Sequence, residues 1–258
     1  MSETPLNNDQ DQYPPAPNPT RNFVIFLQVM IYLLSKHWLL IANLFAGTIL
    51  AMAFLAPLFM FAGWADGADY FYKILAPHDH QLPHRAYFLF GQNGLVQSYS
   101  LEQVLALGAD STNLRSFIGN PEIGYKMALN HRMTAIFAGI FFSGVFWAWN
   151  GRKPKLGLFW FLLLIAPLLI DGFTHLNAEE NGSGFRSNQW AIALTGGTLS
   201  EEFYAGSTVG TLNWWLRTIN GLMFGVGFTW YLYTFLDYRF TKIHNTLRPR
   251  LRKLNLVK

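Results

Sequence analysis

Long apolar runs without charge are the feature that most constrains this chain. No Asp, Glu, Lys or Arg occurs between Lys36 and Asp66, and residues 38–63 are long enough to cross a hydrocarbon core of about 30 Å as a helix. Only 13% of all residues are charged, whereas about a quarter are charged in a typical soluble domain. The sequence therefore predicts a protein whose main solvent is the lipid bilayer.

Three further apolar runs extend this prediction to an all-α, polytopic bundle of about four transmembrane helices. We expect the spans at about residues 38–63, 127–149, 156–175 and 214–236. Residues 23–34 are also apolar but too short to cross, so they predict an interfacial or re-entrant helix. The sequence gives a membrane domain over residues 22–236 with outer loops at about 64–126 and 176–213.

The distribution of basic residues predicts the orientation of the helices. Twelve of the nineteen Lys and Arg residues flank one side of the predicted spans, and seven of these twelve lie beyond Asp237. The positive-inside rule then places both termini in the cytoplasm, and we expect the plasma membrane of a prokaryote. Residues 1–21 are rich in proline and predict a disordered cytoplasmic tail, and residues 237–258 predict a basic cytoplasmic tail.

Composition also excludes several kinds of site and partner. The chain has no cysteine, so disulfides, iron–sulfur clusters and thiolate zinc sites are excluded. The basic residues lie beside apolar runs and form no basic groove, which argues against a nucleic-acid partner. Small residues recur every four positions in the second and fourth spans and predict close helix packing; they are Ala135, Gly139, Ser143, Gly221 and Gly225.

Charged residues on three predicted helices are expected at nearly the same depth in the membrane. Asp171 is expected in the outer leaflet, and Arg132 and Arg217 lie about 30 Å from the inner edge at about 1.5 Å of rise per residue. A lone carboxylate is costly there, so Asp171 should pair with one of these arginines. His175 shares its helix face. The group is either a salt bridge that joins the helices or a polar pocket open to the outside.

The first outer loop is rich in histidine. His78, His80 and His84 lie within seven residues bounded by prolines, and His131 opens the second span. The loop is either a solvated connection or part of a divalent-metal site, whose candidate ligands are Asp79, His80, His131, Asp171 and His175. Farther along, Ser100 and Gln103 predict a capping box at the start of a short surface helix.

Several short motifs occur in one order along the spans. They are His80-Gln81-x-Pro83-x-Arg85, Tyr87-Phe88-Leu89-Phe90-Gly91, Arg132, Pro167-Leu168-Leu169-Ile170-Asp171-Gly172 and Trp215-Leu216-Arg217-x-x-x-Gly221-x-x-x-Gly225. Together they resemble the domain-of-unknown-function family 2085 over roughly residues 75–236. The resemblance implies a membrane protein of unassigned activity. Cysteines of the family pattern are replaced by Asp79, Asn130 and Met133, so any thiol chemistry would need Asp79, His80, His131 and Met133 as a replacement set.

Three functions are compatible with these observations. The first is a membrane protein whose outward polar residues bind a small ligand or a metal; these residues are His80, Arg85, Arg132, Asp171, His175 and Arg217. The second is a non-catalytic accessory subunit or assembly factor of a larger membrane complex, and the third is a transporter component. No nucleophile with an evident base can be assigned, so catalysis is left open. Expected partners are the lipid bilayer and partner subunits or a second copy, and a divalent metal is the one candidate cofactor.

Overall fold

The computed structural model describes residues 19–92, 94–152, 155–181 and 188–257, without the side chains of residues 175–181. The chain divides into two compact units, Met1–Trp38 with Asp237–Lys258 and Leu39–Leu236. Helices α1 (Pro19–Phe61) and α8 (Leu212–Lys253) contribute to both units.

The first unit is a pair of helical segments held by aromatic contacts. Tyr32 of α1 stacks on His244 of α8 with ring centroids 4.9 Å apart, and Trp38 stacks on Phe240 at 5.7 Å. Residues 23–34 belong to the same helix as the predicted first span, and whether they lie in the membrane interface stays a prediction. Of the predicted N-terminal tail, residues 1–18 lie outside the described residues and Pro19 begins α1.

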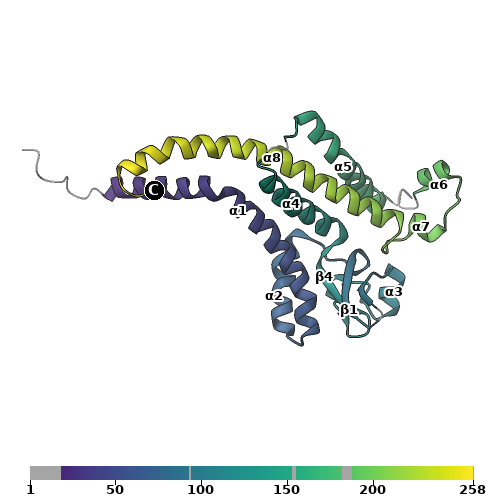
Figure 1. Ribbon diagram of the computed structural model, residues 1–258. Helices are drawn as coiled ribbons and strands as arrows, with labels where there is room; N and C mark the ends of the chain where they lie inside the picture. Colours follow the sequence, from purple (N-terminus) through teal and green to yellow (C-terminus); the bar gives the residue numbers. More distant parts are fainter. Residues whose placement is uncertain (1–18, 93, 153–154, 182–187, 258) are drawn as a thin grey trace, which may run out of the picture. The chain divides into compact units, whose positions relative to one another are not determined.

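The second unit contains four long helical segments that alternate in direction. They are the later part of α1, α4 (His131–Trp149), α5 (Leu158–Asn181) and the first part of α8 (Figure 1). Gly47 of α1 lies against Phe141 of α4, and Gly144 of α4 lies against Asn43 of α1, so these two helices are antiparallel. The rings of Phe161 in α5 and Tyr231 in α8 stack 4.5 Å apart.

Helices α4 and α8 run parallel and touch through their backbones, as the small-residue spacing predicts. A Cβ atom added at Gly221 would lie 2.8 Å from the Arg132 carbonyl oxygen, and one added at Gly225 would lie 2.5 Å from the Ile136 carbonyl oxygen. Real Cβ contacts are never this short. Glycine at both positions therefore permits the close approach that small residues provide between membrane helices.

Among the described helices, two are long and apolar enough to cross a membrane: α1 and α4. The apolar part of α5, Leu158–Thr174, is shorter. The first part of α8 carries polar residues such as Arg217 and Asn220 among its aromatic side chains, which lowers its hydropathy. Crossing by α1 and α4 is thus supported by length and composition, while the third and fourth spans stay predictions.

The protein is mostly helical, as expected, but it is not all-α, because a four-stranded antiparallel sheet of order β2-β1-β4-β3 lies largely within the first predicted outer loop. The strands are β1 (Ala86–Gly91), β2 (Gly94–Gln97), β3 (Gly119–Asn120) and β4 (Gly124–Asn130). Bulky side chains from Tyr87 to Phe90 favour a strand. Residues 127–130, which we expected to open the second span, complete β4, and α4 begins at His131.

The sheet packs on α1 and on α2 (Ala65–Leu75) through one apolar core. Ala53 and Ala56 of α1, Tyr72 of α2 and Leu89 and Leu129 of the sheet are among its buried members. The predicted capping box is confirmed at Ser100, where it opens α3 (Leu101–Ala106). Two short helices, α6 (Gln189–Thr195) and α7 (Glu201–Ala205), occupy the second predicted outer loop.

Substitution of Gly225 by alanine tests the α4–α8 contact. The added methyl group would overlap the backbone of α4 at Ile136, so we expect the Gly225→Ala variant to lose about 1–3 kcal/mol of stability. Thermal unfolding in mild detergent measures the loss. Gly157→Ala is the matched control, because a Cβ atom at Gly157 meets nothing within 4 Å. Equal stability of the two variants would contradict the close packing.

Candidate functional site

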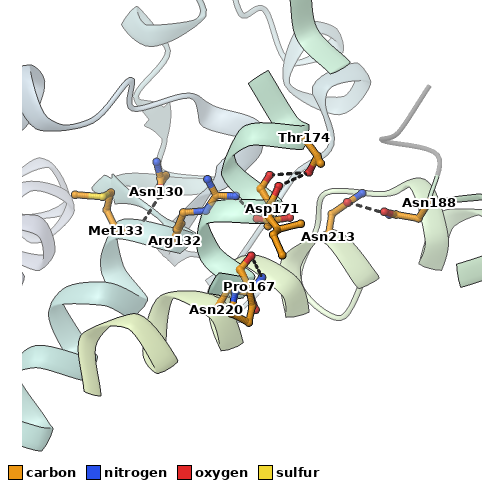
Figure 2. Close-up of polar contacts among 10 residues, drawn as sticks. Asn130, Arg132, Met133, Pro167, Asp171, Thr174, Asn188, Asn213 and Asn220 are labelled. Atoms are coloured by element: carbon orange, nitrogen blue, oxygen red, sulfur yellow. Dashed lines mark hydrogen bonds and ion pairs between the residues drawn. The ribbon is translucent and has the colours of Figure 1, made fainter. Parts of the chain in front are cut away.

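An ion pair joins the start of α4 to α5. The Arg132 guanidinium donates to the Asp171 carboxylate, and the two side chains point toward each other in Figure 2. Both are about one-fifth exposed, with 22% for Arg132 and 19% for Asp171. The expected pairing of Asp171 with one of two arginines is thus resolved in favour of Arg132.

Helix α8 completes the surroundings of this pair with polar side chains on the face toward α4 and α5. Arg217 is 5% exposed and Asn220 is 6% exposed. The amide of Asn220 donates to the Pro167 carbonyl of α5 at 3.5 Å (Figure 2). Arg217 precedes Gly221 by four residues and so shares its helix face, and a Cβ atom at Gly221 would meet the Arg132 carbonyl. Arg132, Asp171 and Arg217 therefore lie at one end of the three helices; we call them the polar cluster.

A row of aromatic and imidazole rings borders the polar cluster. His131 is fully buried and its ring lies 4.3 Å from the ring of Tyr87 on β1. The indole nitrogen of Trp214, in the first turn of α8, donates to the Tyr87 hydroxyl at 3.0 Å. His131 also lies near enough to His84 and Arg217 for their charges to interact. Sequence reasoning missed Tyr87 and Trp214, because their pairing depends on a sheet that it did not expect.

The remaining predicted residues lie at different places. Ala86 pairs with Asn130 in the sheet, so Arg85 and His131 are the next residues on the two antiparallel strands. His80 is exposed, and no contact described here brings it to Arg132 or Asp171. The side chain of His175 lies outside the described residues.

The carboxylate of Asp79 is buried and accepts hydrogen bonds from neighbouring N–H groups. Its carboxylate is 5% exposed and accepts hydrogen bonds from the backbone N–H of Gln81 (2.7 Å), the backbone N–H of Asn130 (2.6 Å) and the Asn130 amide (2.9 Å). Burial raises the pKa of this carboxyl, and the three hydrogen bonds oppose that rise. Asn130 in turn caps α4 by accepting from the Met133 N–H at 2.9 Å.

The described residues do not assemble the metal site that the histidine-rich loop suggested. No group of three or more His, Asp or Glu side chains among them lies close enough to hold a metal ion. The oxygens of Asp79 are occupied by N–H donors, and those of Asp171 face Arg132. The metal assignment of Asp79, His80, His131, Asp171 and His175 thus has no support from the part of the chain that the structure describes.

A buried lysine lies six residues before Arg132. Lys126 on β4 is fully buried, and its ammonium group donates to the carbonyls of Gln81 (2.9 Å) and Arg115 (2.8 Å). Its pKa is lowered to about 7, mainly by burial and also by the Arg115 charge, while the Asp79 charge acts in the opposite direction. The Tyr72 hydroxyl donates to the Lys126 carbonyl, and burial raises the pKa of Tyr72.

Comparison with known proteins identifies one family. A family model described as "Predicted membrane protein (DUF2085)" matches residues 111–231, which confirms the resemblance derived from the motifs. The match includes Arg132, Asp171, Arg217, Gly221 and Gly225, whereas His80 and Arg85 precede it. Neither the curated proteins nor the solved structures contain a significant match.

The depressed pKa of Lys126 predicts a specific pH dependence of stability. The unfolded chain holds the lysine proton up to its ordinary pKa of 10.5, whereas the folded protein loses it near 7. The unfolded state therefore binds more protons between these values, and the stability contributed by this group rises with pH from about 7 to 9. We expect the thermal midpoint to rise over this range in the wild type and to rise less in Lys126→Met. Parallel curves for the two proteins would contradict a shifted lysine.

Proposed function

We propose that this protein crosses the membrane four times, with both termini in the cytoplasm, and that its polar cluster binds a small ligand with an anionic group on the outer side. The family match over residues 111–231 supports a membrane protein, and the lipid bilayer is then its first partner. The observation that carries the ligand proposal is the ion pair of Arg132 and Asp171 at the end of apolar helices, beside the buried Arg217.

The directions of the helices support the proposed topology. Asp171 of α5 lies beside Arg132 at the start of α4, and Phe161 lies beside Tyr231 farther along α8, so α5 is antiparallel to both. With α1 antiparallel to α4, four crossings would put residues 39 and 236 on the same side. The basic residues between α4 and α5 and beyond Asp237 assign that side to the cytoplasm.

Cysteine labelling tests this topology directly, because the chain has no cysteine of its own. We expect a membrane-impermeant maleimide added to intact cells to label Ser111→Cys, which lies in the extramembrane sheet region. Lys155→Cys and Asn245→Cys should react only after the membrane is permeabilised. Labelling of Asn245→Cys in intact cells would overturn the proposed orientation, and opposite results for Lys155→Cys and Asn245→Cys would overturn four crossings.

The charge of the cluster indicates the kind of ligand. Residues 131–149 and 212–236 contain no acidic residue, and Asp171 is the only one in residues 158–174. These segments therefore bring together two arginines and one carboxylate, a net positive charge in a region of low dielectric constant. Ionisable groups at such a depth are costly and commonly functional. The planar guanidinium group suits carboxylates and phosphates, so two arginines at one place favour a ligand with such a group.

Ligand retention by the purified protein tests this proposal. We expect protein isolated in mild detergent to retain a stoichiometric small anion, detected by mass spectrometry of the extracted protein, and Arg217→Gln to lose it. Arg217→Lys should retain less than the wild type, because an ammonium group cannot bind two oxygens in parallel. Arg152→Gln is the matched control, since Arg152 follows the other end of α4.

The same sample distinguishes the alternatives. Elemental analysis that found stoichiometric metal would overturn an organic anion as the ligand. Fixed partner subunits with no retained small molecule would overturn ligand binding in favour of an accessory role. A folded, monodisperse Arg217→Gln protein with full ligand occupancy would remove Arg217 from the site.

A further inference from the structure

A cleft of about 320 Å³ lies in the extramembrane part of the second unit. One wall is the side of α2 with Asp69, Tyr72 and Lys73, and the other is the segment from Asn113 to Ile118 before β3. Gln81 forms the floor. This volume is at the lower end of the range of small-molecule sites in proteins.

Buried polar contacts hold the walls of the cleft in place. The Lys126 ammonium binds the carbonyls of Gln81 and Arg115 and so joins the floor to the far wall. The Gln81 amide donates to the carbonyls of Tyr72 (2.9 Å) and Ala128 (3.0 Å) and joins the floor to α2 and β4. Burying a lysine away from water costs free energy, and an apolar side chain of the same volume would cost less. A pre-formed cleft supported at this cost has the character of a binding site.

The charges around the cleft favour an anion. Arg115 is exposed on the far wall, and among the described residues its guanidinium group makes no ion pair. Lys73 on the opposite wall pairs with Asp69 at 2.5 Å, with 75% and 51% of the two side chains exposed. Such an exposed pair is weak, so a ligand can compete for Lys73. Two basic side chains and one carboxylate therefore line the space, and the buried ammonium group of Lys126 lies behind its floor.

The Lys126 and Arg115 charges also repel each other, and this repulsion helps to lower the pKa of Lys126. A negative charge placed between the walls would relieve it. Asp79 is the acid on the buried side of Lys126, but its carboxylate already accepts three hydrogen bonds. The Tyr72 hydroxyl binds the Lys126 carbonyl and carries no charge at neutral pH.

We propose that this cleft is a second binding site, distinct from the polar cluster, which takes a small molecule through a carboxylate or phosphate group held between Arg115 and Lys73. The apolar side chains of Ala76 and Ile118 also line the cleft, and they would contact the rest of the ligand. The ligand is small, because about 320 Å³ lies at the lower end of the volumes of small-molecule sites.

Titration of the full-length protein in mild detergent with succinate and with inorganic phosphate tests the site. We expect a saturable rise of the thermal midpoint at pH 6.5 with at least one of the two probes. Arg115→Gln should weaken the apparent affinity about tenfold, since it removes one charge-assisted contact. Asp69→Asn should strengthen it, because Lys73 is then released from its partner.

Two controls separate this site from other effects. Arg152→Gln should leave the response unchanged. Arg217→Gln should lose the retained polar-cluster ligand but still respond to the probes, so loss of the polar-cluster ligand and loss of the cleft ligand are distinguishable results. Succinate affinity should fall as the pH rises through about 7, and Lys126→Met should remove that dependence. A response to neither probe, or an equal response in wild type, Arg115→Gln and Asp69→Asn, would overturn the proposal.

Discussion

The junction between strand β4 and helix α4 determines how the second unit is organised. The chain changes from strand to helix at Asn130 without a loop. Asn130 caps the helix with its side-chain oxygen and binds the Asp79 carboxylate with both its backbone N–H and its amide. This arrangement satisfies helix N–H groups that would otherwise lack partners. The sheet and the first turn of α4 are therefore fixed to each other, and the position of Arg132 follows from them.

The sequence predicted the long helices of this unit better than the sheet and the segments around it. The apolar runs and small-residue spacing are strong, local signals, and α4 ends at Trp149 as expected. The candidate partners of Asp171 could be reduced to two arginines, because the rise per residue of a helix gives the expected depth of each charged residue. The choice of Arg132 depends on helix rotation, which follows from the contacts of Gly221 and Gly225 in three dimensions.

The sequence did not predict the sheet, because some residues of its strands favour a helix. Strand β4 contains the helix-forming residues Met127, Ala128 and Leu129 directly before an apolar helix, so the sequence pattern predicts that they begin the second span. All three are buried by partners distant in sequence, and such tertiary burial overrides local propensity. The same omission concealed Lys126, which the sequence places in an outer loop and the structure places in a core.

Close backbone packing and polar chemistry depend on each other at the end of α4. Gly221 allows α8 to approach the Arg132 carbonyl, and Arg217 lies one turn earlier on the same helix. A larger residue at Gly221 would separate the helices where their charged side chains meet. The small residues therefore do more than join two helices: they bring two arginines to the same end of the helices as one carboxylate, where partial burial strengthens the interactions between charges. On the other side of Asn130, Lys126 supports the cleft from the same strand that positions Arg132. A short continuous segment, residues 126–132, thus links the cleft beside α2 to the polar cluster of the helices.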